Sequence, residues 1–186
     1  MKTIISMSEN DNFTILANTK WLLNNSMKDN MNAADIIIKI IAIENYYGKN
    51  DYGMNMYNKM QRIRVAKNKL IEREKAENER KFIKLIKSFE EKGYDKKFPV
   101  ELNKNFEVFE GSHRTACSIY FNIKEIPVTF NKHIWNLEYD YSLKWFKENG
   151  MEDYIPLIKE KYYDIIKWQK EWATILSVIW TIYTFE

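Results

Sequence analysis

The sequence has 186 residues, the length of one domain, and its 45% hydrophobic content with only 5 Gly and 3 Pro excludes a disordered or collagen-like chain. Its 29 Lys and Arg against 26 Asp and Glu leave a formal charge of +3, too small for a strongly basic nucleic-acid-binding protein. The single cysteine, Cys117, excludes an internal disulfide and a zinc site made of several thiolates.

Residues 1–93 predict a mostly helical N-terminal part. Met1–Met7 carries one Lys and is followed by polar residues before an apolar stretch of signal-peptide length develops, so we expect a cytoplasmic protein. A strand is predicted at Phe13–Leu16, and a short helix begins near Thr19 and ends in a polar cluster at 24–26.

Two longer helices follow in this part. Apolar residues at steps of three and four predict a helix that has Asn32 as its N-cap and stops at Gly48. After a polar turn, a second helix begins near Met54, and the charged run that follows continues helically to Gly93. Both signs of charge alternate in that run with i to i+4 spacing, which favours a solvated helix face over a nucleic-acid or membrane patch.

Residues 94–135 predict a small sheet. Two strands, Phe98–Leu102 and Phe106–Phe109, surround a turn at Asn103–Asn105, and Ile126–Phe130 is a third strand. A helix at Ser112–Phe121 lies between the last two strands and makes a βαβ-like unit. If those two strands pair in parallel, their crossover is right-handed.

Residues 136–186 return to helix, with helices at Tyr141–Glu148 and from Tyr154 to about Trp172. The apolar segment Trp172–Phe185 is shorter than the roughly twenty residues of a spanning helix, so we expect no transmembrane segment. It is interpreted as a buried final element, with a homodimer or membrane-surface contact as alternatives. The fold class is thus α+β, in one domain spanning 1–186: a small mixed sheet surrounded by many helices.

The turn between the second strand and the following helix carries the clearest chemistry. Gly111 lets the backbone turn sharply there, Ser112 is placed to cap the helix, and the first N–H groups of the helix point outward. His113 and Arg114 add side-chain donors, and a cation at a helix N-terminus is unfavourable unless an anion joins it. The pattern favours a phosphate site. The alternative is that Arg114 pairs with Glu110 or another carboxylate and that His113 only packs.

A polar stripe in the second long helix is a candidate substrate contact. Asn55 or Tyr57, together with Gln61 and Arg64, recurs at helical steps on one face. The alternative interpretation is a network of hydrogen bonds between helices. The lone His133, after the last strand, is interpreted as structural, with a ligand contact at the sheet edge as the alternative.

Phe106–Val128 resembles the core of the ParB/sulfiredoxin superfamily. Members carry an acidic residue, Gly, a variable residue, His or Arg, and Arg at the start of a helix, then an Ala one turn later and a strand reading Ile-Pro-Val. The resemblance implies a small mixed sheet of this type and a helix start that holds nucleotide phosphates. Carried over residue by residue, it implies that Glu110 lies near the metal or the reacting group and that phosphates are held by Gly111, Ser112, His113 and Arg114, with Thr115 beside them.

At several positions this chain differs from the superfamily pattern, and these differences argue against some of its known activities. Sulfiredoxins carry their reactive cysteine where this chain has Ser112, and Cys117 is better explained as a small buried thiol. Chromosome-partition proteins carry more arginines in this box and a following helix-turn-helix domain, which is not evident here. The free-serine kinases of this fold use an N-terminal carboxylate as base, and Glu44, Asp51 and Glu110 are candidates for that role.

The sequence therefore predicts a nucleotide-binding enzyme that transfers a phosphoryl group from ATP or another nucleotide to a small hydroxyl-bearing metabolite, or hydrolyses the nucleotide. Glu110 and His113 are the expected catalytic residues. Mg²⁺ would come with the nucleotide, on phosphates and water rather than on protein ligands. The alternative is a non-catalytic ParB-like module that binds a nucleotide or nucleic acid and regulates an assembly, and a third interpretation is a scaffold that has lost the site.

Overall fold

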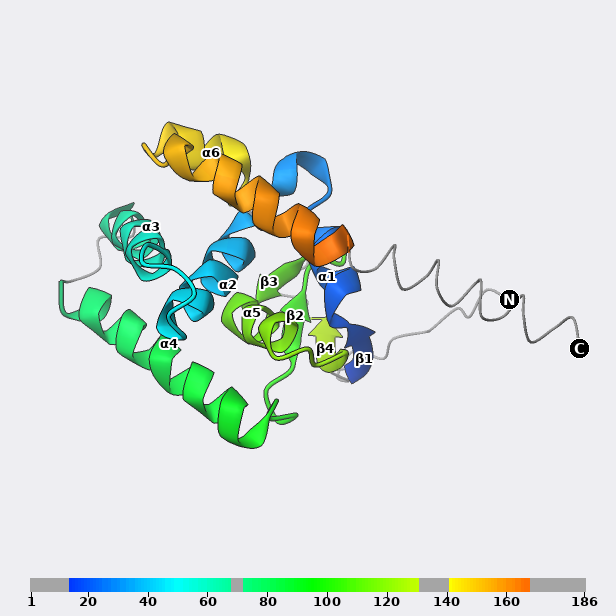
Figure 1. The fold of residues 1–186 in the computed structure, drawn as a ribbon. Coiled ribbons are helices and arrows are strands. Elements are labelled where there is room, and N and C mark those ends of the chain that lie inside the picture. Colours follow the sequence, from blue (N-terminus) through cyan, green and yellow to red (C-terminus); the bar gives the residue numbers. More distant parts are fainter. Residues whose placement is uncertain (1–13, 68–71, 131–140, 168–186) are drawn as a thin grey trace, which may run out of the picture.

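The computed structural model describes residues 14–67, 72–130 and 141–167 (Figure 1). The strands are β1 (Thr14–Asn18), β2 (Val100–Leu102), β3 (Val108–Glu110) and β4 (Glu125–Phe130). The longer helices are α1 (Thr19–Ser26), α2 (Ala34–Tyr46), α3 (Gly53–Lys67), α4 (Glu72–Lys92), α5 (Ser112–Tyr120) and α6 (Leu143–Glu148). Two 3₁₀ turns, η1 (Asp29–Met31) and η2 (Glu152–Tyr154), complete the list, and residues 155–167 are also helical. The predicted α+β class is confirmed.

The four strands form one mixed sheet in the order β1-β4-β2-β3. β1 pairs antiparallel with β4, β4 pairs parallel with β2, and β2 pairs antiparallel with β3. The strand, helix and strand of the predicted βαβ-like unit occur in that order, but β2 lies between β3 and β4. The parallel pair is therefore β2 with β4, and the connection between them contains β3 and α5.

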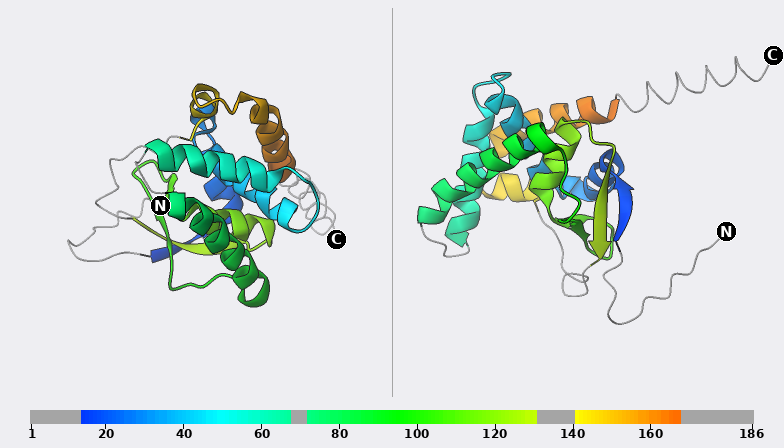
Figure 2. Two further views of the ribbon diagram at one scale, coloured as in Figure 1. Left: turned by 90° about the vertical axis from the view of Figure 1, so that its left-hand side faces the viewer. Right: turned by 90° about the horizontal axis from the view of Figure 1, so that it is seen from below.

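Most of the helices gather over one face of the sheet, as the views of Figures 1 and 2 agree. α2 lies at the centre of this layer and contacts both α3 and α5. Its residues from Ala34 to Ile43 are all buried, because a run of isoleucines supplies apolar surface on every side of the helix. Two charged residues, Asp35 and Lys39, are buried with them.

α3 crosses α2 at very close range. A Cβ atom at Gly53, the first residue of α3, would lie 2.2 Å from the carbonyl oxygen of Ile41, so only glycine permits this approach. The Asn50 side chain fixes the same crossing, because its amide donates to the Ile41 carbonyl oxygen at 3.1 Å and its oxygen accepts from the Gly53 N–H at 2.8 Å. The start of α3 is thus held on the backbone of α2.

Three predicted boundaries are wrong for identifiable reasons. α2 begins at Ala34 and Asn32 is not its N-cap, because Ala33 occupies the cap position; the Asn32 side-chain N–H group donates to the Glu107 carboxylate at 3.4 Å. The strand predicted from Phe98 begins only at Val100, since Pro99 has no N–H for the sheet. The strand predicted from Phe106 begins at Val108, since Phe106 has a positive φ of 61° and belongs to the hairpin turn.

Several predictions fall on residues outside the described ranges. They concern Met1–Met7, His133, the apolar segment Trp172–Phe185 with its homodimer contact, and the end of the last helix beyond 167. Among the helices of the described ranges, none combines the length and the apolar character that crossing a membrane requires.

Candidate functional site: the turn before helix α5

The turn between β3 and α5 can be made only by glycine. Gly111 has a φ of 100°, in the left-handed region that other residues avoid. A Cβ atom on Gly111 would lie 2.8 Å from Nη2 of Arg114 and 3.0 Å from Cγ2 of Val100. The Arg114 side chain therefore folds back over the bare Cα of Gly111.

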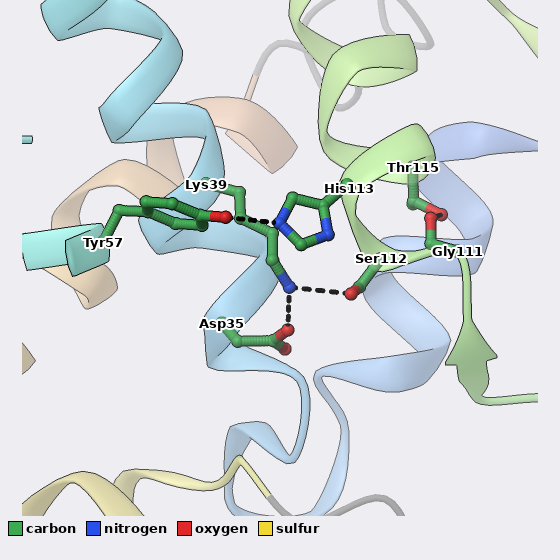
Figure 3. A network of polar contacts seen from close by, with 7 residues as sticks. All are labelled: Asp35, Lys39, Tyr57, Gly111, Ser112, His113 and Thr115. Carbon is green, nitrogen blue, oxygen red and sulfur yellow. Dashed lines mark hydrogen bonds and ion pairs between the residues drawn. The ribbon is translucent and has the colours of Figure 1, made fainter. Parts of the chain in front are cut away.

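The start of α5 has no side-chain cap. Gly111 occupies the N-cap position, and Ser112, predicted to cap the helix, is instead the first helical residue. The Ser112 hydroxyl oxygen accepts a hydrogen bond from Nζ of Lys39 at 2.7 Å (Figure 3). Because Gly111 at the N-cap has no side chain, the N–H groups of the first turn have no intrahelical or side-chain acceptor among the described residues, and they form the positive end of the helix dipole.

Lys39 places a buried cation beside this turn. Its Nζ forms an ion pair with the Asp35 carboxylate one turn earlier in α2, and both side chains are buried. Burial lowers the pKa of Lys39, and the charge and hydrogen bond of Asp35 partly offset that effect. Sequence reasoning missed this pair, although a lysine inside an isoleucine run with an aspartate four residues before it is a signal for a buried ion pair.

His113 faces α3 and α4. Its Nε2 lies 2.9 Å from the Tyr57 hydroxyl, and its ring meets the edge of Phe82 at a centroid distance of 4.8 Å. Burial lowers the pKa of His113 well below 6.5, and the positive charges of Lys39, Arg64 and Arg114 lower it further. The imidazole is therefore neutral. We assign its proton to Nδ1, with the Tyr57 hydroxyl donating to Nε2, because the Asn78 carbonyl oxygen, another acceptor for that hydroxyl, is farther away at 3.5 Å.

Arg114 is not neutralised by a carboxylate in the described residues. Its Nη2 donates to the Pro99 carbonyl oxygen at 3.1 Å, and no ion pair with Glu110 or any other described acidic residue forms. Its buried Nε has no hydrogen-bond partner there either. The alternative of an Arg114–carboxylate pair thus fails for this part of the chain, and the guanidinium keeps its charge and a free donor.

α3 brings part of the predicted polar stripe to the same place. Tyr57 contacts His113, and Gln61, one turn later, is only 4% exposed. The Gln61 amide lies close enough to Tyr57 to lower the pKa of that phenol, which burial raises, but its Nε2 has no hydrogen-bond partner of good geometry in the described chain. Arg64 lies over the Tyr141 ring at 5.3 Å. Asn55 is exposed, on the other side of α3 from Tyr57.

The three carboxylates proposed as a general base belong to different elements of the fold. Glu110 is exposed at the end of β3, next to the turn, and lies opposite Glu101 of β2. Glu44 accepts from Nζ of Lys161 at 2.8 Å, and Asp51 is exposed at the start of the turn before α3. Of the three candidates, Glu110 is adjacent in the chain to Gly111 and the turn before α5.

Two further residues of α5 face inward. Thr115 is fully buried, and its hydroxyl donates to the Gly111 carbonyl oxygen at 3.2 Å, so it supports the turn from behind. Cys117 is fully buried as predicted, and burial raises its pKa to about 12, which keeps the thiol protonated. Within the described ranges no group of three or more His, Cys, Asp and Glu side chains is placed to hold a metal ion.

The lowered pKa of His113 leads to a testable pH dependence. The folded protein binds fewer protons than the unfolded chain once the pH falls below about 6.5, so we expect the free energy of unfolding to decrease there. NMR of the imidazole carbons should show one histidine that stays neutral through pH 6.5, and His113→Gln should remove that signal. Urea-unfolded protein, in which both histidines titrate near 6.5, is the control. A His113 midpoint at or above 6.5 would contradict the assignment.

Comparisons of the chain with protein-family models, with curated proteins and with solved structures find no match.

Proposed function

We propose that the chain binds the phosphates of a nucleotide at the N-terminus of α5 and transfers the terminal phosphoryl group to a small hydroxyl-bearing compound. The observation that carries the proposal is an excess of donors. The N–H groups of the first turn and the Arg114 guanidinium lie at this turn, and the Gln61 amide lies beside the Tyr57 hydroxyl that contacts His113. Two of these donors, Arg114 Nε and Gln61 Nε2, are buried without an acceptor in the described chain. A buried unsatisfied donor costs about 1–3 kcal/mol, which an anionic oxygen would recover.

The charges near the turn favour a phosphate in particular. Lys39, Arg64 and Arg114 are all near enough to His113 to lower its pKa, and Asp35 offsets only one of them. An anion at a helix N-terminus is stabilised by the dipole and by the N–H groups, and a guanidinium grips phosphate oxygens in pairs. The resemblance of Phe106–Val128 to the ParB/sulfiredoxin superfamily adds weight to a nucleotide as the source of that phosphate.

In the proposed reaction the substrate hydroxyl oxygen forms a bond to the terminal phosphorus, and the bond from that phosphorus to the bridging oxygen breaks. The nucleoside diphosphate leaves, and the hydroxyl proton passes to a carboxylate, for which Glu110 is the candidate nearest in the chain. Mg²⁺ accompanies the nucleotide and neutralises its phosphates. Neutral His113, held by Tyr57, donates from Nδ1 to a phosphate oxygen without taking up the substrate proton.

Calorimetry and phosphorus NMR test this proposal. We expect ATP, CTP or GTP with Mg²⁺ to bind with measurable heat, and a new phosphate-ester signal to appear when serine or another small alcohol is added. Binding without any ester or released phosphate would favour the regulatory module over the enzyme. Absence of binding by every nucleotide would overturn the phosphate site itself.

A further inference from the structure

The buried ion pair of α2 has no role in the phosphoryl transfer described above. Asp35 and Lys39 are both buried in the centre of the helical layer, where two charges are costly to desolvate. A pair of apolar side chains would fill the same space at no such cost, so the fold alone does not account for the pair. The position of the pair is informative, because Lys39 Nζ also donates to the Ser112 hydroxyl oxygen, at 2.7 Å.

This contact determines what the first turn of α5 offers to a ligand. Serine near a helix start commonly accepts from the backbone N–H groups of that helix and so satisfies them. Here the Ser112 oxygen accepts from Lys39, and α5 has no side-chain cap (Figure 3). The hydroxyl is thus turned toward α2, and the N–H groups of the first turn have no side-chain acceptor among the described residues.

The Lys39 ammonium also lies at the positive end of the α5 dipole, where a cation is unfavourable. A positive charge beside the positive end of a helix is destabilised, and this one is in a region of low dielectric. An anion at the turn would reverse the sign of that interaction. A second observation concerns the residues that contact His113: the amide of Gln61, which is 4% exposed, lies beside the Tyr57 hydroxyl, and its buried Nε2 has no partner in the described chain.

We infer that Lys39 is a positioning residue of the proposed phosphate site: its buried ammonium holds the Ser112 hydroxyl off the helix end and places a positive charge behind the open N–H groups. The inference rests on the proposed function, since it concerns how that same site binds a polyphosphate. Asp35 orients the ammonium and favours its charged form, so the pair presents its positive end to α5.

A double variant tests the inference at constant net charge. Asp35→Leu with Lys39→Met removes one charge of each sign, and replacing a buried ion pair by apolar side chains is often neutral or stabilising. We expect the variant to bind inorganic tripolyphosphate on the order of tenfold more weakly than the unchanged protein. The matched control is Glu77→Gln with Lys81→Met, which removes an exposed i,i+4 pair of α4 and should leave the affinity unchanged.

Titration of the Lys39 ammonium gives a second readout that needs no variant to fold. The groups that act on it are Asp35 on α2, Arg64 on α3, and His113 and Cys117 on α5. If the charged form binds tripolyphosphate tenfold more tightly than the neutral form, linkage requires the ammonium midpoint to rise by about one pH unit at saturation. Nitrogen-15 NMR of the lysine side chains measures it.

The outcomes separate the two proposals. Weaker binding by the double variant together with a raised ammonium midpoint supports the role of Lys39. If the unchanged protein binds tripolyphosphate while the double variant binds equally well, or the midpoint does not move, Lys39 is only structural and the phosphate site survives. If the unchanged protein does not bind tripolyphosphate or any nucleotide, the proposed function fails and the role of Lys39 with it.

Discussion

Replacing Arg114 by alanine is expected to weaken nucleotide binding about 10- to 100-fold. A hydrogen bond to a charged group contributes about 1.5–3 kcal/mol, and each 1.4 kcal/mol changes the affinity tenfold. The guanidinium of Arg114 carries its charge without a described carboxylate partner, and its Nε has no described acceptor. The Nε–H group of Arg114 is therefore available to a phosphate oxygen.

Calorimetry with the nucleotide that binds the unchanged protein measures this loss. Arg62→Ala removes an exposed arginine from α3 and is the control for a loss of positive charge at the surface. Arg114→Lys should recover only part of the affinity, because an ammonium keeps the charge but not the planar fork that grips two oxygens. Equal affinities for Arg114→Ala and the unchanged protein, with the thermal unfolding of both alike, would be incompatible with a phosphate at this turn.

Replacing Gly111 by alanine is expected to lower the free energy of unfolding by about 2–5 kcal/mol. A side chain in the left-handed region costs about 1–2 kcal/mol, and overpacking of the kind that a contact 3.0 Å from Cγ2 of Val100 produces adds about 1–3 kcal/mol. The new methyl group would also displace the Arg114 guanidinium, whose Nη2 lies 2.8 Å from its position. Stability and nucleotide binding should therefore fall together.

Gly93→Ala separates the cost of the left-handed backbone from the cost of overpacking. Gly93 also has a positive φ, of 71°, but no atom lies within 4 Å of the place its Cβ would take. Urea unfolding should thus give a loss of about 1–2 kcal/mol for Gly93→Ala, with nucleotide binding unchanged. If both variants lose the same stability, the close approach of Arg114 to the backbone does not exist in solution.

The regular elements were predictable because each has a strong local pattern. The isoleucine periodicity predicted α2, and Gly48 and Gly93 marked helix ends that the structure confirms in left-handed backbone. The glycine between β3 and α5 was likewise predictable, since a sharp turn from strand to helix needs a residue without a Cβ atom. In these places the local sequence and the tertiary structure agree.

The two predicted caps are wrong because Ala33 and Gly111 occupy the cap positions, and the two predicted side chains instead bond to partners distant in the sequence. Asn32 reaches Glu107 and Ser112 receives Lys39, and neither partner can be inferred from the residues beside the cap. Lys39 itself was missed, because its charge suggests exposure whereas its place in an apolar helix suggests burial. The contact of Arg114 with the Pro99 carbonyl oxygen also depends on the sheet order, which local patterns do not specify.

The close crossing at Gly53 joins α2 and α3, the two helices whose side chains bond to the start of α5. α2 carries Lys39, and α3, fixed on the backbone of α2 at Ile41, carries Tyr57. A shift of α2 relative to α5 would therefore stretch the Lys39–Ser112 and Tyr57–His113 hydrogen bonds in concert rather than one at a time. The turn should consequently gain or lose its two anchors as a unit, and the phosphate site proposed for it would be preformed rather than one that closes around its ligand.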